Sequence, residues 1–255
     1  MKLRIVEDYE ALSFVAAAIV ADEIERQGPL VLLPATGSTP IGAYQQLAQR
    51  HAARELDSSQ ITLVQLDEYV DIAPDDRRSL FGWMKRLLID PLKIPSNCVL
   101  PLDGYQADLA LSCHRYDQSV RASGGLNLAI LGLGPNGHLG FNEPPAGPSA
   151  PTRVVQLSPA SIESNARYWG SRSLVPTRAL TAGMDIILSA QKILLLVSGS
   201  HKAEVLRRTL AGKMTDELPA SYLRLAPDVT VIADRPAWPW GDGGAHLVDD
   251  IAISW

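Results

Sequence analysis

The chain has 255 residues, enough for one large α/β domain or two small ones, with a core that needs no disulfide or metal to hold it. Its composition is 46% hydrophobic and 20% charged, with 19 glycines and 18 prolines, which excludes disordered, collagen-like and coiled-coil chains. The formal net charge is −5 and no run of Lys and Arg exceeds two residues, so neither nucleic acid nor an anionic membrane is expected as a partner.

In chain order, helical periodicity and apolar runs predict helix 8–27, strand 30–33, helix 41–48, strand 61–66, helices 80–92 and 105–122, strands 126–131 and 192–197, helix 201–210 and strand 229–233. Strands that are apolar on both faces and alternate with helices predict an α/β fold: a single doubly wound, mostly parallel sheet with helices on both faces. No linker, repeat or low-complexity segment interrupts residues 1–255, which are therefore interpreted as one domain. In such sheets ligands bind beyond the carboxyl ends of the strands.

The cysteine content and the N-terminus indicate the compartment. Cys98 and Cys113 have no spacing typical of a zinc site and are interpreted as buried small apolar residues in a reducing environment. Lys2 and Arg4 precede an apolar stretch in the manner of a signal peptide, but acidic residues flank that stretch on both sides. With no apolar run near 18 residues, the sequence predicts a cytoplasmic protein.

Two predicted strand ends carry polar motifs whose roles the spacing leaves open. After strand 30–33 comes a turn of small residues, Thr36, Gly37, Ser38 and Thr39. Such a turn either lets backbone N–H groups approach an anion or is a plain tight turn. Asp67 and Glu68 directly follow strand 61–66. They either form a solvated rim, or one carboxylate points into the cleft as a base.

A glycine-rich segment follows strand 126–131 and reads Gly132-Leu133-Gly134-Pro135-Asn136-Gly137-His138-Leu139-Gly140-Phe141-Asn142-Glu143-Pro144. Its start matches the G-x-G-x-x-G dinucleotide pattern, but that pattern requires a helix, which the following prolines oppose, so no nicotinamide or flavin cofactor is expected. His138 is either a proton-transfer group, with Glu143 fixing its tautomer, or a structural side chain held by loop carbonyls. A metal site with Glu143 or Asp67 would lack a second histidine, and no metal is expected.

These three motifs, in this order and at this spacing, resemble the glucosamine-6-phosphate deaminase (isomerase) family. The likeness covers roughly residues 10–235 and continues through three further segments, Ala179-Leu180-Thr181-Ala182-Gly183-Met184, Gly199-Ser200-His201-Lys202-Ala203 and Leu218-Pro219-Ala220-Ser221. It implies an enzyme that converts glucosamine 6-phosphate and water into fructose 6-phosphate and ammonia without a cofactor.

The resemblance also implies a role for each site residue. Asp67 matches the carboxylate that moves a proton from C2 to C1 of the sugar. His138 matches the ring-opening histidine, and Glu143 matches the acid that orients it. The phosphate would lie on the turn formed by Thr36, Gly37, Ser38 and Thr39, with Arg167 and Lys202 as its cations.

Three positions depart from the family pattern or have no counterpart in it. Asn136 stands where many members have an acid, so a shifted histidine pKa is expected. Arg153 is followed two residues later by Val155 and not by lysine, which argues against activation by N-acetylglucosamine 6-phosphate. The tail 236–255, with Trp238, Trp240 and Trp255, is expected to pack against the domain.

Several alternatives remain at this point. Galactosamine 6-phosphate needs the same base, histidine and clamp, and would differ only in contacts to the C4 hydroxyl. A 6-phosphogluconolactonase is less favoured, because Tyr69 and Leu139 stand where lactonases typically have arginine and threonine. A catalytically inactive sugar-phosphate sensor would have lost the base. The sequence does not decide between a monomer and a homo-oligomer, since the family includes monomers and hexamers. Segments 75–83 and 158–172 are predicted to be mobile segments that cover the cleft.

Overall fold

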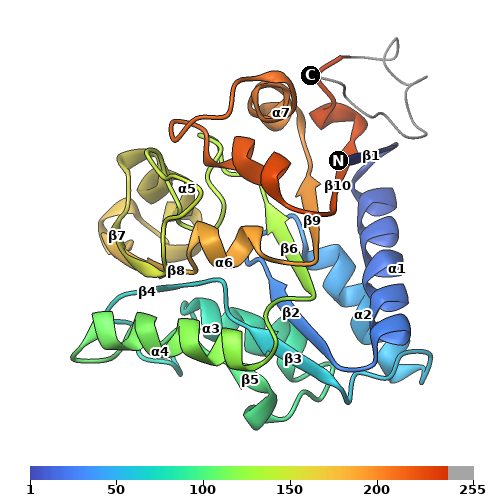
Figure 1. The fold of residues 1–255 in the computed structure, drawn as a ribbon, viewed down its shortest axis with the longest axis horizontal. Helices are drawn as coiled ribbons and strands as arrows, with labels where there is room; N and C mark the ends of the chain where they lie inside the picture. Colours follow the sequence, from blue (N-terminus) through green and yellow to red (C-terminus); the bar gives the residue numbers. More distant parts are fainter. Residues whose placement is uncertain (241–255) are drawn as a thin grey trace.

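The computed structural model describes residues 1–240 and contains a seven-stranded sheet in the order β1-β10-β9-β6-β2-β3-β5, in which every neighbouring pair is parallel (Figure 1). Its strands are β1 (Lys2–Val6), β2 (Leu30–Pro34), β3 (Ile61–Val64), β5 (Val99–Leu100), β6 (Leu128–Gly132), β9 (Lys192–Val197) and β10 (Val229–Asp234). The helices are α1 (Tyr9–Gln27), α2 (Ile41–Ala52), α3 (Leu80–Met84), α4 (Leu109–Ala122), α5 (Pro159–Trp169), α6 (Met184–Leu188) and α7 (Ala203–Ala211). The predicted fold class, a doubly wound parallel sheet, is confirmed.

The strand order reverses beside β2. From β2 the chain passes through α2 to β3 on one side, whereas β6 and β9 lie on the other side of β2. Crossovers that leave in opposite directions open a crevice at the carboxyl ends of the two strands, where ligands bind in this class of sheet. The turn that begins at Thr36 and the glycine-rich loop after β6 both start at this crevice.

Alternate side chains of each central strand enter separate cores on the two faces of the sheet. Leu30 and Leu32 of β2 pack with α1, α2 and α3, while Val31 and Leu33 pack with α4, α6 and α7. Figure 1 shows α1 and α2 on one side of the sheet and α4, α6 and α7 on the other. Both faces are therefore apolar, which explains why these strands read as continuous hydrophobic runs.

A second, antiparallel sheet was not expected from the sequence. It contains β4 (Asp67–Tyr69), β8 (Arg178–Thr181) and β7 (Arg153–Gln156), in that order. Tyr69 anchors it: its ring centroid lies 5.5 Å from that of Phe141 and 5.2 Å from that of Trp169 on α5. Strands of three or four residues are too short to show periodicity, so no pattern in the sequence indicated this sheet.

Several predicted boundaries were wrong. Strand 61–66 ends at Val64 and helix 80–92 is α3 followed by a π-helical turn, Lys85–Ile89. Helix 105–122 begins only at Leu109, because the side chain of Asp108 accepts the Leu111 N–H at 2.9 Å as an N-cap. The helices differ by small shifts: Asp8 is the N-cap of α1, α2 extends to Ala52, and a 3₁₀ turn, Ser200–Lys202, precedes α7. Among the strands, β2 and β10 each extend one residue further than predicted, and β6 covers residues 128–132.

Further expectations concern the cysteines and the two ends of the chain. Cys113 is buried as predicted, whereas Cys98 is only partly buried. Over residues 1–240, no helix combines the length and the apolar character needed to cross a bilayer. Trp238 packs against the main core, with its ring centroid 4.7 Å from that of Trp240. Trp255 and the tail from residue 241 lie outside the described residues.

Candidate active site

An open cleft of about 1150 Å³ lies at the carboxyl ends of β2, β6 and β9. The loops after these strands line it, together with residues of β4, the segment leading into α3, and α5. Eight of the predicted site residues line this cleft: Thr36, Gly37, Ser38, Thr39, Asp67, His138, Arg167 and Lys202. Asn136 and Glu143 are not among its lining residues.

Asp67 is the buried acid of the cleft. It is 5% exposed at the start of β4, and its Oδ1 accepts a long hydrogen bond of 3.4 Å from the Thr36 hydroxyl. Burial, followed by the negative charge of Glu68, raises the pKa of Asp67 to about 7, and the hydrogen bond from Thr36 opposes that rise. A carboxyl with this pKa is partly ionised at neutral pH and is a stronger base than an exposed carboxylate.

The neighbouring acid, Glu68, has a different task. Its carboxylate accepts the backbone N–H groups of Tyr69, Leu80 and Phe81 at 2.8, 3.0 and 2.8 Å, and the side-chain amide of Gln65 at 3.0 Å. Two of those N–H groups belong to the first turn of α3. The N–H groups of a first turn have no acceptor within their own helix. Glu68 therefore connects β4 to α3 and is not part of a solvated rim, which was one of the two interpretations of the sequence.

His138 lies against the backbone of Gly134. A Cβ at Gly134 would overlap the imidazole ring, so a glycine is required there for the ring to occupy this place. Burial lowers the pKa of His138 to about 4, with Glu143 acting in the opposite direction and Lys202 lowering it further. The imidazole is consequently uncharged at neutral pH, with one nitrogen able to donate a proton and the other able to accept one.

Glu143 acts on His138 through its charge, and no hydrogen bond joins the two side chains. Its Oε1 accepts the Ser158 N–H at 3.2 Å, whereas Glu143 Oε2 and His138 Nδ1 are both buried without a hydrogen-bond partner. Asn136 accepts the backbone N–H of His138 at 3.3 Å, so its described contact is with the loop backbone and not with the imidazole ring. Burial and Lys202 lower the pKa of His138, and Asn136 is not among the causes of this shift.

Two cations, Arg167 and Lys202, line the same cleft. Arg167 is exposed on α5, where its guanidinium lies 4.7 Å from the ring centroid of Tyr168 and donates to the Tyr168 hydroxyl at 2.7 Å. Burial, followed by the nearby charge of Arg167, lowers the pKa of Lys202. An anion that binds near both cations, as a phosphate would, offsets the repulsion between them.

The small-residue turn faces the same cleft. Gly37 has a φ of 108°, a conformation that side chains other than glycine rarely adopt. Thr36, Ser38 and Thr39 surround it, and α2 begins two residues after Thr39. The turn, Arg167 and Lys202 therefore offer donors and positive charge to the same cleft.

Other cleft residues carried no signal in the sequence. Arg77, Arg78 and Arg86 line the cleft next to α3. The Arg78 guanidinium lies 4.7 Å from the ring centroid of Trp169 and pairs with Asp76 at 2.7 Å, which links the two segments predicted as mobile cover. Long exposed arginines are usually solvated surface residues, so only the fold reveals this group.

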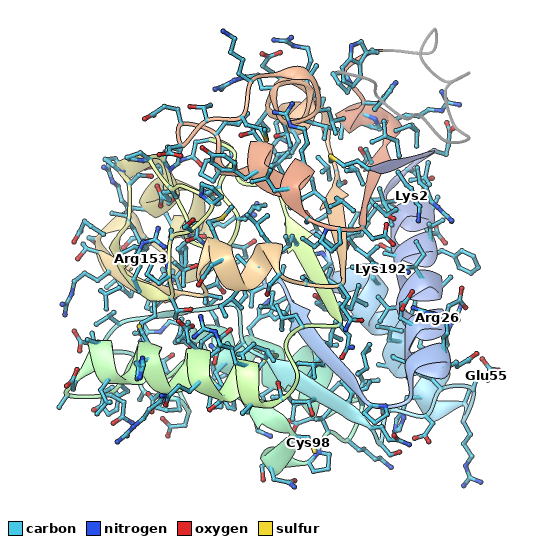
Figure 2. All side chains as sticks on the ribbon, viewed as in Figure 1. Lys2, Arg26, Glu55, Cys98, Arg153 and Lys192 are labelled. Atoms are coloured by element: carbon cyan, nitrogen blue, oxygen red, sulfur yellow. The ribbon has the colours of Figure 1, made fainter. Side chains whose placement is uncertain are left out.

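Arg153 connects the small sheet to the histidine loop. Its guanidinium donates to Asn142 Oδ1 at 2.8 Å, and Asn142 in turn donates to the carbonyls of Leu139 and Ala182 at 3.0 and 2.8 Å. Figure 2 shows Arg153 at the side of the molecule opposite Arg26 of α1. Across residues 1–240, no three His, Cys, Asp or Glu side chains gather in a way that could hold a metal ion.

Comparison with known proteins agrees with this geometry. The family described as "Glucosamine-6-phosphate isomerases/6-phosphogluconolactonase" matches residues 9–232. The chain belongs to this family. Among its relatives, a glucosamine-6-phosphate deaminase from Halothermothrix orenii is 40% identical over 238 residues, which cover 93% of this chain and 98% of that protein. Glucosamine-6-phosphate deaminase 1 of Bacillus subtilis is 42% identical over 238 residues, with the same two coverages.

Solved structures of the family have the same fold. A monomeric glucosamine-6-phosphate deaminase matches with a TM-score of 0.91 at 41% identity, covering 93% of this chain and 98% of that one. A 6-phosphogluconolactonase from Trypanosoma cruzi matches with a TM-score of 0.75 at 21% identity, over 92% of this chain and 95% of that one. At that identity the likeness is one of fold.

Proposed function

We propose that this protein is a glucosamine-6-phosphate deaminase, which converts glucosamine 6-phosphate and water into fructose 6-phosphate and ammonia. One observation carries the proposal: a buried carboxyl with a pKa of about 7, an uncharged histidine and a pair of cations line the same cleft. The identity of about 40% to proteins of that name supports the same activity.

The phosphate of the substrate binds at the turn that contains Gly37 and Ser38. Its charge is balanced by Arg167, which can donate two parallel hydrogen bonds, and by Lys202, which acts as a compact point charge. Binding at this end leaves the sugar ring directed toward Asp67 and His138, which line the same cleft.

His138 opens the sugar ring. The uncharged imidazole accepts the proton of the anomeric hydroxyl, and the imidazolium that forms donates a proton to the ring oxygen of the sugar. The C1–O5 bond breaks, and C1 becomes an aldehyde. The pKa of about 4 keeps the imidazole uncharged before this step. Glu143 stabilises the positive charge that develops on the ring during the transfer.

Asp67 then carries out the isomerisation. Its carboxylate removes the proton from C2 while O1 takes a proton from the C2 ammonium group, which gives an enolamine with a C1 hydroxyl. Asp67 then returns its proton to C1, and the C2–N bond becomes that of an iminium group. Water adds to C2, the C2–N bond breaks, and ammonia leaves as the C2 ketone forms. The overall reaction consumes one water and uses no redox cofactor.

Release of ammonia tests the proposal. The purified protein is supplied separately with glucosamine 6-phosphate and galactosamine 6-phosphate, which differ only at C4, and we expect faster release from the first. Asp67→Asn should lower kcat by about 10²–10⁴-fold, because an amide cannot accept the C2 proton. The matched control, Asp22→Asn, changes an exposed acid of α1 and should leave the rate unchanged.

Other outcomes are equally informative. Release from neither sugar phosphate contradicts the proposed function. Preference for galactosamine 6-phosphate corrects the epimer, and a near wild-type rate of Asp67→Asn removes Asp67 as the base.

Two further expectations belong to the same proposal. We infer a cytoplasmic location, in keeping with the two cysteines, which are both free thiols. Association of copies of this chain is tested by light scattering of the purified protein, for which the monomeric relative provides a point of comparison.

A further inference from the structure

The hydroxyl of Tyr9 lies between the two ends of the small-residue turn. It donates to the carbonyl of Ser38 at 3.1 Å and accepts the N–H of Gly42 at 3.0 Å. Tyr9 belongs to α1, 29 residues before Ser38, and it is also one of the residues that line the cleft. One hydroxyl group therefore spans the turn and the first turn of α2 from a different helix.

The start of α2 lacks a capping group of its own. Pro40 occupies the N-cap position, and no side chain there accepts a hydrogen bond. The first N–H groups of a helix have no partner within the helix and need one from outside. The Ile41 N–H reaches the Ser38 carbonyl only at 3.4 Å, so the Tyr9 hydroxyl supplies the better acceptor for this helix end, at Gly42.

Tyr9 is itself held in place by the close packing of α1 and α2. It is the first residue of α1, and its carbonyl accepts the Ser13 hydroxyl at 2.8 Å. A Cβ at Gly42 would collide with the Ser13 side chain and lie 3.3 Å from the Tyr9 hydroxyl oxygen. Gly42 thus permits the helix approach that brings the hydroxyl to the turn.

We propose that Tyr9 is a positioning residue for phosphate binding. By fixing the Ser38 carbonyl and the Gly42 N–H, its hydroxyl holds the turn in the shape in which its backbone donors face the phosphate of the substrate. The proposal rests on the proposed function, because it takes that phosphate as the ligand of the turn. Tyr9 acts through the turn and not on the reacting carbons, so it governs binding and leaves the chemical steps to Asp67 and His138.

The variant Tyr9→Phe removes both hydrogen bonds and retains the ring. We expect the KM for glucosamine 6-phosphate and the Kd for inorganic phosphate, measured by calorimetry, to rise together by about three- to tenfold, the effect of one or two lost hydrogen bonds. The kcat and the pH dependence of activity should stay at wild-type values. The control Tyr105→Phe removes the hydroxyl of a tyrosine that is 59% exposed outside the cleft and should change none of these quantities.

The calorimetric arm needs no turnover, so it tests Tyr9 even where the proposed function fails. An unchanged phosphate Kd in Tyr9→Phe overturns the proposal, as does wild-type protein that binds no phosphate. A variant with a lower melting temperature or a lower kcat but an unchanged KM would make Tyr9 a merely structural residue, which also overturns it. Absence of ammonia release by the wild type, together with weakened phosphate binding in Tyr9→Phe, would reject the deaminase assignment alone.

Discussion

At the scale of single residues, burial moves the two central titratable groups in opposite directions on the pH scale. It raises the pKa of Asp67 to about 7 and lowers that of His138 to about 4. The cause is the same in both cases, because a poorly solvated site disfavours whichever form is charged. At neutral pH the cleft therefore combines a carboxyl close to its midpoint with an uncharged imidazole, a pairing suited to proton transfer in both directions.

The pH dependence of kcat/KM should report the ionisation of Asp67. Only the carboxylate accepts a proton, so kcat/KM should fall about tenfold per pH unit below roughly pH 7. Thr36→Val removes a hydrogen bond that lowers the pKa of Asp67, so the acid limb should move to higher pH. Glu68→Gln removes a like charge and should move it to lower pH.

The substrate phosphate also titrates, near pH 6, but equally for all three proteins. If the acid limb of the kcat/KM profile lies at the same pH in the wild type, Thr36→Val and Glu68→Gln, a group other than Asp67 sets the pH dependence. Thermal unfolding of each variant checks that Glu68→Gln, which alters the acceptor of the α3 N–H groups, remains folded.

A second residue-scale prediction concerns the glycine beneath His138. Gly134→Ala introduces a methyl group where the imidazole lies, so the ring must move and kcat should fall by about 10²–10⁴-fold. Gly132→Ala is the matched control, since a Cβ there meets nothing within 4 Å. Neither glycine has a positive φ, so the backbone conformation at both positions accommodates alanine. Equal activities of the two variants would contradict the argument.

At the scale of elements, the small antiparallel sheet carries Asp67, the proposed base, and several of its neighbours. β4 carries Asp67, which pairs with Thr181 of β8, and Glu68 ties the same strand to α3. Trp169 at the end of α5 packs on Tyr69 of β4. Asp67, the start of α3 and the helix that carries Arg167 thus belong to one connected group of elements.

Under the proposed function, α5 carries Arg167 for phosphate binding and takes no part in the chemical steps. Arg167→Ala should raise the KM for the sugar phosphate about tenfold or more, the usual loss for a hydrogen bond to a charged group, with kcat little changed. Arg172→Ala, just beyond α5 and outside the cleft, is the control and should retain the wild-type KM. Steady-state kinetics of the two variants checks this, and an unchanged KM in Arg167→Ala would remove Arg167 from the phosphate site.

At the scale of the whole molecule, the distribution of charge matters more than its sum. The chain carries a net charge of −5, yet five cationic side chains line the cleft: Arg77, Arg78, Arg86, Arg167 and Lys202. A cleft of one predominant sign attracts a ligand of the opposite sign before contact. The anionic substrate is consequently expected to be drawn to the cleft of an acidic protein.

This attraction predicts a dependence on salt. The range of electrostatic interactions shrinks from about 30 Å at 0.01 M to about 3 Å at 1 M ionic strength. We therefore expect kcat/KM to fall as sodium chloride is raised, while kcat at saturating substrate changes little. Arg86→Ala should show a shallower salt dependence than wild type. A kcat/KM that is insensitive to salt would contradict a steering role for the cleft.

The local sequence determined much of the architecture. β2, β6, β9 and β10 are buried on both faces, so each reads as an apolar run, and the helices between them show apolar periodicity. Most of the candidate site residues follow such strands directly, because the carboxyl ends of parallel strands meet at one edge of a sheet. The sequence by itself therefore indicated residues that line the cleft: the turn at Gly37, the acid Asp67 and the loop of His138.

Only the tertiary structure decided what depends on distance through space. The approach of Arg167 to Lys202, the span of the Tyr9 hydroxyl across the turn, and the arginines beside α3 join segments that are far apart in the chain. The short strands β4, β7 and β8 carry too few residues to show a period, and residues of all three pack in one apolar cluster that the fold brings together. The pKa values of Asp67 and His138 also depend on the tertiary structure, because the residues that exclude water from these two groups are brought there by the fold.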